Sequence, residues 1–92
     1  MTPRLENWAV IAVPDSPYQA PELWRQRLHG NVYGHPRFGN GTEVTTSPIT
    51  SKKGENILTR NTEYELGIID TEYEKLYPNA RERLLNSLKE GN

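Results

Sequence analysis

Two kinds of hydrophobic pattern divide the chain and predict a sheet followed by helices. Residues 8–13 form a continuous apolar run, WAVIAV, bounded by Asn7 and Pro14. A run of this length that contains valine and isoleucine predicts a central strand buried on both faces. Residues 1–6 show no such pattern, and we expect them to form a frayed arm.

The next segment is predicted to hold a short helix and a second strand. Pro21 suits the first turn of a helix that runs to about Leu28. Residues 28–34, LHGNVYG, then predict a short strand that its two glycines weaken. The sequence HPRFGNG at 35–41 predicts a loop that ends in an Asn-Gly turn signal.

The middle of the chain is predicted to form a β-hairpin with a polar centre. The segments TEVTTSPIT (42–50) and NILTRNTEYEL (56–66) are rich in β-branched residues, and SKKGE (51–55) has turn chemistry. If the turn centres on Lys53 and Gly54, the residue numbers of two cross-strand partners sum to about 107. The predicted pairs are Thr45 with Thr62, Thr46 with Asn61, and Ser47 with Arg60. Polar groups at the centre of the hairpin indicate either a solvent-exposed face or a binding site for a polar ligand.

The C-terminal quarter shows helical spacing. Two capping boxes begin at Thr71 and Asn79, and Pro78 separates them. They predict helices over 71–77 and 79–90. The second helix has one apolar stripe, made of Ala80, Leu84, Leu85 and Leu88. The predicted fold class is therefore α+β: a small antiparallel or mixed sheet of four to five strands, one short helix and two C-terminal helices.

Composition predicts one domain with a thin core. The chain has 92 residues, of which 34% are hydrophobic, and it has no cysteine for a disulfide or a thiolate metal site. Self-association is the remaining way to bury more area. We therefore expect a single domain over residues 1–92 that forms a homo-oligomer through the apolar stripe of the last helix.

Charge and hydropathy restrict the partners. Eleven basic and twelve acidic residues leave a net charge of −1, which argues against duplex nucleic acid as a partner. The longest apolar run is far too short to span a membrane, and no signal-peptide pattern is present. We expect a cytoplasmic protein that binds neither membranes nor duplex DNA.

The sequence contains no recognised catalytic or metal-binding motif. His29 and His35 have no further ligands at a zinc spacing, and Ser47 lies outside any G-x-S-x-G elbow. The glycines between residues 30 and 41 match neither a P-loop nor a dinucleotide fingerprint. We therefore predict a protein that is not an enzyme and that uses no metal and no cofactor.

The remaining polar residues suit a binding site for a phosphate-bearing ligand. Guanidinium, amide and hydroxyl groups bind phosphate oxygens, and a ring such as Phe38, Trp24 or Tyr64 can stack on a base. The candidate ligand-binding residues are His35, Arg37, Phe38, Thr46, Ser47, Arg60, Asn61, Thr62, Arg81 and Arg83. In the alternative interpretation, the helical arginines pair with neighbouring acids and the threonines form an ordinary exposed sheet.

The same stretch resembles a pattern found in short proteins of phages and prophages. The matching segments are HPRF at 35–38, NGTEVTTSPI at 40–49 and LTRNTEYELG at 58–67. Among named families, this pattern is similar to the Thoeris anti-defence sponges, phage proteins that capture immune signals of the cyclic ADP-ribose type.

The resemblance implies a small sheet with C-terminal helices and a symmetric oligomer with ligand pockets at its subunit interfaces. It also implies sequestration of a small nucleotide-derived signal, without catalysis, in the host cytosol. In this chain Asn61 would be the ligand-binding strand asparagine, and Arg81 or Arg83 the helical arginine that holds phosphate. Residues two apart on a helix point about 200° apart, so only one arginine can face the ligand. The other function left open is a small phage protein-interaction module that inhibits a host factor.

Overall fold

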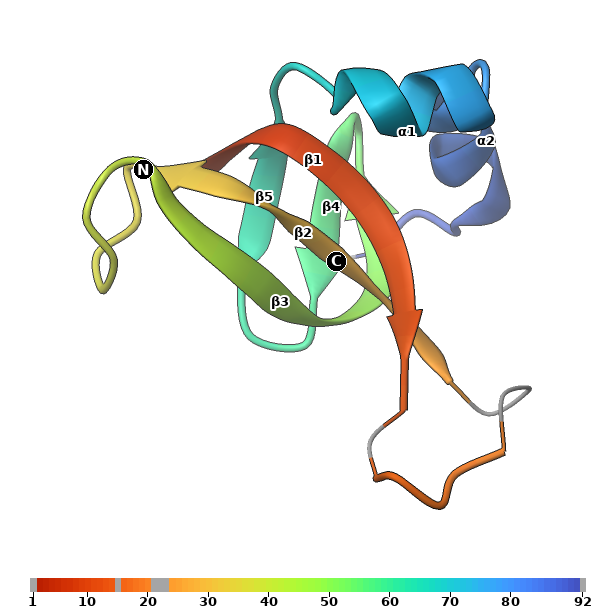
Figure 1. Ribbon diagram of the computed structural model, residues 1–92. Coiled ribbons are helices and arrows are strands. Elements are labelled where there is room, and N and C mark those ends of the chain that lie inside the picture. Colours follow the sequence, from red (N-terminus) through yellow and green to blue (C-terminus); the bar gives the residue numbers. More distant parts are fainter. Residues whose placement is uncertain (1, 15, 21–23, 92) are drawn as a thin grey trace.

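Five strands close into a small barrel in the computed structural model, which describes residues 2–14, 16–20 and 24–91 (Figure 1). Successive strands pair antiparallel, and β1 and β5 close the barrel in parallel. The strands are β1 (Arg4–Val13), β2 (Arg25–Tyr33), β3 (Thr42–Lys53), β4 (Asn56–Thr59) and β5 (Glu63–Leu66). The helices are α1 (Thr71–Leu76) and α2 (Ala80–Ser87).

The fold is mostly β, so the predicted α+β class is wrong. The two C-terminal helices have only six and eight residues. α2 stops short of residue 90 because Leu88 is already extended, with φ −105° and ψ 146°. The predicted helix Pro21–Leu28 is also wrong where the structure describes it, because residues 25–28 belong to β2. Residues 21–23 of that prediction lie outside the described residues.

β1 begins earlier than its apolar run and is not buried on both faces. Residues 4–6, predicted to be frayed, pair with β2, and Arg4 and Leu5 also pair with β5. Leu5 and Trp8 are both fully buried, although an odd spacing normally places two side chains on opposite faces of a strand. A β-bulge at Asn7, which has φ 51°, shifts the register and turns both side chains inward. After Trp8 no residue of the run is fully buried, and Ala12 is exposed.

The central hairpin is displaced from its predicted register. The turn begins at Gly54, with φ 63°, and Lys53 pairs with Asn56, so partners near the turn are two positions away from the predicted ones. The predicted strand 56–66 is two strands, because the Thr59 amide and hydroxyl both donate to the Thr62 carbonyl and close a tight turn. The predicted pairs between residues 45–47 and 60–62 are therefore not ladder pairs.

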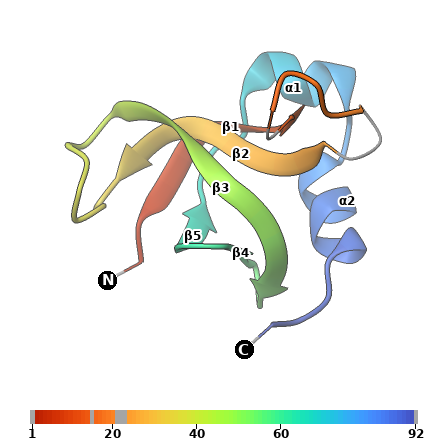
Figure 2. The ribbon, with the colours of Figure 1, turned by 90° about the horizontal axis from the view of Figure 1, so that it is seen from below.

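The core lies inside the barrel and extends under α2. Its members are Leu5, Trp8, Leu28, Val32, Ile57, Tyr64, Leu66 and Leu84. Both helices lie on one side of the barrel, and the loop at residues 34–41 projects from the other (Figures 1 and 2). The apolar stripe of α2 packs on the barrel of its own chain, with Ala80 and Leu84 buried and Leu85 and Leu88 partly buried. The stripe therefore no longer supports the prediction of a homo-oligomer, which stays a prediction.

The helix starts differ from the predicted capping boxes. α1 is capped by Asp70, the residue before the predicted cap Thr71. The Asp70 carboxylate accepts a hydrogen bond of 3.1 Å from the main-chain amide of Tyr73. Asn79 does precede α2, but it adopts a left-handed conformation and its side chain makes no capping bond. α2 therefore depends on packing rather than on a side-chain cap.

Gly30 provides a test of the close approach between β1 and β2. A Cβ at Gly30 would lie 2.8 Å from the Glu6 carbonyl oxygen and 3.1 Å from the Trp8 Cα, and neither main-chain atom can move independently. We expect Gly30→Ala to lower the free energy of unfolding by about 1–3 kcal/mol, measured by urea denaturation. Gly39→Ala is the control, because its nearest atom is 3.9 Å away and Gly39 is exposed. Equal stability of the two variants would contradict this packing.

Candidate functional site

A cleft of about 670 Å³ lies between the loop after β2, the first half of β3 and the turn that joins β4 to β5. Its walls come from three separate segments of the chain. They are made of His35, Pro36, Arg37, Phe38, Val44, Thr45, Thr46, Ser47, Asn61, Thr62 and Tyr64.

The loop at residues 35–38 is held in place by short-range hydrogen bonds. The Gly34 amide donates to the Asn40 side-chain oxygen at 2.8 Å, and the Arg37 amide donates to His35 Nδ1 at 2.9 Å. Gly34 and Gly41 have φ of 74° and 87°, which a residue with a side chain rarely adopts. These glycines and the Asn-Gly turn signal give the loop its local shape.

Three rings line one part of the cleft. The His35 ring lies 4.8 Å from the Phe38 ring and 6.2 Å from the Tyr64 ring, with which it is stacked at 27°. Burial raises the pKa of Tyr64 above its ordinary value, although a hydrogen bond with Thr62 opposes the shift. The Tyr64 phenol is therefore neutral at pH 7. Phe38 is 43% exposed and offers its ring to a ligand.

The hydroxyls of the cleft differ in their availability. Thr46 is buried, and its hydroxyl accepts from the Leu28 amide at 3.0 Å and donates to the Ser47 carbonyl at 2.8 Å. Thr46 therefore serves the fold. The Ser47 hydroxyl accepts from the main-chain amide of Asn61 at 3.2 Å and keeps its own proton to donate.

Two side chains of the cleft have unused hydrogen-bonding groups. The Asn61 side-chain amide and the Arg37 guanidinium make no hydrogen bond or ion pair within the described ranges of the chain. Both residues are exposed, and none of the described residues that line the cleft is acidic. The cleft therefore combines aromatic rings with a free amide and a free cation, a set of groups that suits an anionic ligand with a planar ring.

The structure brings together seven of the ten predicted site residues. His35, Arg37, Phe38, Thr46, Ser47, Asn61 and Thr62 all line this one cleft. Arg60 is adjacent in the chain but exposed outside it, and its amide donates to the Pro48 carbonyl at 3.0 Å. Sequence reasoning missed Pro36 and Val44, which have no distinctive chemistry. Trp24 does not line the cleft, and its indole donates to the Gln19 carbonyl.

The two helical arginines lie outside this cleft. The Arg81 guanidinium donates to the carbonyls of Leu66 and Gly67 and lies 5.6 Å from the centre of the Trp8 ring. Arg81 therefore joins α2 to the barrel. Arg83 lines a different cavity, beside the helices. Within one chain, neither helical arginine lines the cleft that contains Asn61.

Among the described residues there is neither a group of side chains suited to a metal ion nor a membrane-spanning helix. Across residues 2–14, 16–20 and 24–91, no three histidine or acidic side chains are grouped so that they could hold a metal ion. In the same ranges, no helix has the length and apolar character needed to cross a membrane.

Comparisons with protein-family models, with curated proteins and with solved structures each found no match to this chain.

The different roles of the two helical arginines can be measured. Arg81→Met removes hydrogen bonds to two main-chain carbonyls and a cation–π contact, so we expect a loss of about 1–3 kcal/mol in the free energy of unfolding. Arg83→Met is the matched control on the same helix and should change stability by less than about 0.5 kcal/mol. The order of the two effects would be reversed if Arg83, and not Arg81, joined α2 to the barrel.

Proposed function

We propose that this chain is a non-catalytic binding protein that captures a small nucleotide-derived signalling molecule, of the cyclic ADP-ribose type, in the cleft described above. The observation that supports this most is the placement of the free Asn61 amide and the free Arg37 guanidinium around the ring pair of His35 and Phe38. A base would stack on an exposed ring, and Arg37 would bind phosphate oxygens.

The size and charge of the cleft support the same proposal. Its volume of about 670 Å³ falls within the range of about 300–1,000 Å³ that is usual for small-molecule sites. None of the described residues in its walls is acidic, so these walls do not repel a phosphorylated ligand. The positive charge is local, since the chain as a whole has a net charge of −1.

The arrangement of possible nucleophiles favours binding over turnover. The nearest approach to a nucleophile with its base is the Thr45 hydroxyl, 2.9 Å from His29 Nδ1. However, the other nitrogen of His29 lies 3.8 Å from the Glu43 carboxylate, too far for a hydrogen bond that would orient the ring. A proposal of capture without chemistry also agrees with the resemblance to the Thoeris anti-defence sponges, and would place the protein in the host cytosol.

A protein-interaction module is the second candidate, and exposed apolar side chains favour it. Ile68, Leu76 and Tyr77 are 67%, 74% and 51% exposed and lie before, within and after α1. Such a surface suits a host protein or a second copy of the chain. It predicts capture of a partner that Leu76→Glu abolishes and that small molecules do not affect.

The test of the first proposal is capture followed by mass analysis. The protein is incubated with a panel of cyclic dinucleotides and cyclic ADP-ribose isomers, freed of unbound compound, and heated. We expect one compound to be released intact. Release of an altered compound would indicate an enzyme, and retention of none would contradict the nucleotide proposal.

Two substitutions should separate binding from folding. We expect Asn61→Ala and Arg37→Gln each to weaken capture by a factor of ten or more, about 1.4 kcal/mol, with the melting temperature of the ligand-free protein unchanged. Arg60→Gln is the charge-matched control, because Arg60 is exposed outside the cleft. Thr46→Val should instead lower stability by about 1–3 kcal/mol, because it leaves the buried Leu28 amide without its partner.

A further inference from the structure

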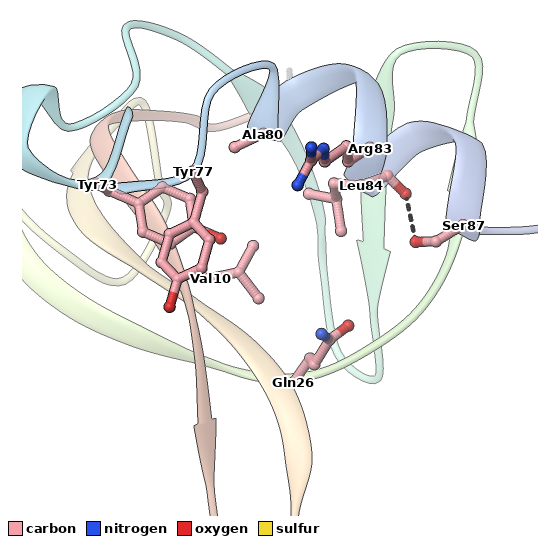
Figure 3. A pocket seen from close by; sticks show the side chains of 8 residues that line it. All are labelled: Val10, Gln26, Tyr73, Tyr77, Ala80, Arg83, Leu84 and Ser87. Carbon is pink, nitrogen blue, oxygen red and sulfur yellow. Dashed lines mark hydrogen bonds between the residues drawn. The ribbon is translucent and has the colours of Figure 1, made fainter. Parts of the chain in front are cut away.

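A second cavity, of about 250 Å³, lies between the helices and strands β1 and β2 (Figure 3). It shares no residue with the cleft around Asn61. Its walls are formed by Val10, Gln26, Tyr73, Tyr77, Ala80, Arg83, Leu84 and Ser87.

The walls of this cavity are mainly apolar and aromatic. Ala80 and Leu84 are each 6% exposed and are fixed by the core beneath α2. The Tyr73 and Tyr77 rings pack 5.0 Å apart and form one side, and Tyr73 in turn packs 6.4 Å from the Trp8 ring. Burial raises the pKa of Tyr73, so this wall is uncharged at pH 7.

Among the described residues that line the cavity, Arg83 is the one cation. Figure 3 shows the Arg83 guanidinium directed toward the two tyrosines, and Gln26 lies across the cavity from it. Within the part of the chain that the structure describes, the guanidinium makes no ion pair and no hydrogen bond, and no acidic residue lines the cavity. The Ser87 hydroxyl is already used, because it donates to the Leu84 carbonyl at 2.8 Å.

We infer that this cavity is a binding site for a small aromatic carboxylate. Its volume admits a single ring with a short side chain, and is well below that of the cleft around Asn61. The ring would lie against Tyr77 and Leu84 and cover apolar surface of both. The carboxylate would receive the fork of the Arg83 guanidinium, which matches two oxygens at once. The apolar walls and the free cation thus select a ligand that is flat at one end and anionic at the other.

Three probe compounds test the two halves of this inference separately. They are 3-phenylpropionate, its neutral amide, and propionate, which lacks the ring. Each is titrated into the ¹⁵N-labelled full-length protein, and the amide shifts of residues 80–87 are followed. We expect 3-phenylpropionate to bind at least about tenfold more tightly than either of the other probes. Equal binding of the acid and the amide, or the absence of shifts at residues 80–87, would overturn the inference.

The variant Arg83→Gln assigns the preference to one side chain. In this variant the acid and the amide should bind with a ratio near one, because both then meet only a neutral amide. Arg60→Gln, which removes an equal charge elsewhere, should keep the wild-type ratio. Persistence of the acid preference in Arg83→Gln would overturn the role of Arg83. Neither result depends on capture of a nucleotide in the other cleft.

Discussion

The whole fold depends on the contact that Trp8 makes with the chain just after β5. Only two residue pairs join β1 to β5, Arg4 with Glu65 and Leu5 with Leu66, so the ladder alone closes the barrel over a short distance. Beyond it, the Trp8 indole donates to the Gly67 carbonyl at 3.0 Å, and the Arg81 guanidinium donates to the same oxygen and lies near the Trp8 ring. One carbonyl thus joins β1, the end of β5 and α2. Gly67 permits this approach because an added Cβ would lie 2.9 Å from the Leu5 carbonyl oxygen.

Closure of the barrel at this point also shapes the cleft on its other side. β5 carries Tyr64 inward, where its ring meets that of His35 from the loop after β2. The turn before β5 brings the main-chain amide of Asn61 against the Ser47 hydroxyl of β3. Three segments that are distant in the sequence therefore meet only because β4 and β5 return to β1. Groups that are held in place before a ligand arrives lose less entropy on binding, which is how this arrangement would favour the proposed ligand.

Much of the candidate site could be predicted from the sequence, whereas the fold class could not. The polar residues at 45–47 and 61–62 do meet in one cleft although the predicted register was wrong, because the turn after β4 folds back beside β3. The bulge at Asn7 and the strand at residues 25–28 were missed, because both follow from packing against neighbouring strands rather than from local preference. Arg81 was assigned to a ligand for a similar reason: an exposed-looking arginine on an amphipathic helix gives no sequence sign that two carbonyls lie within its reach.

The central claim is that the cleft around Asn61 and Arg37 is a site for nucleotide-type ligands, and it can be located directly. The most direct measurement is an NMR titration of the ¹⁵N-labelled protein with ADP-ribose as the probe, which carries a base, two riboses and two phosphates. A nucleotide site in this cleft predicts saturable chemical-shift changes in the main-chain amides of residues 35–38, 45–47 and 61–64. The amide signals of α2 should not change. Shifts confined to α2, or the absence of any saturable shift, would contradict it.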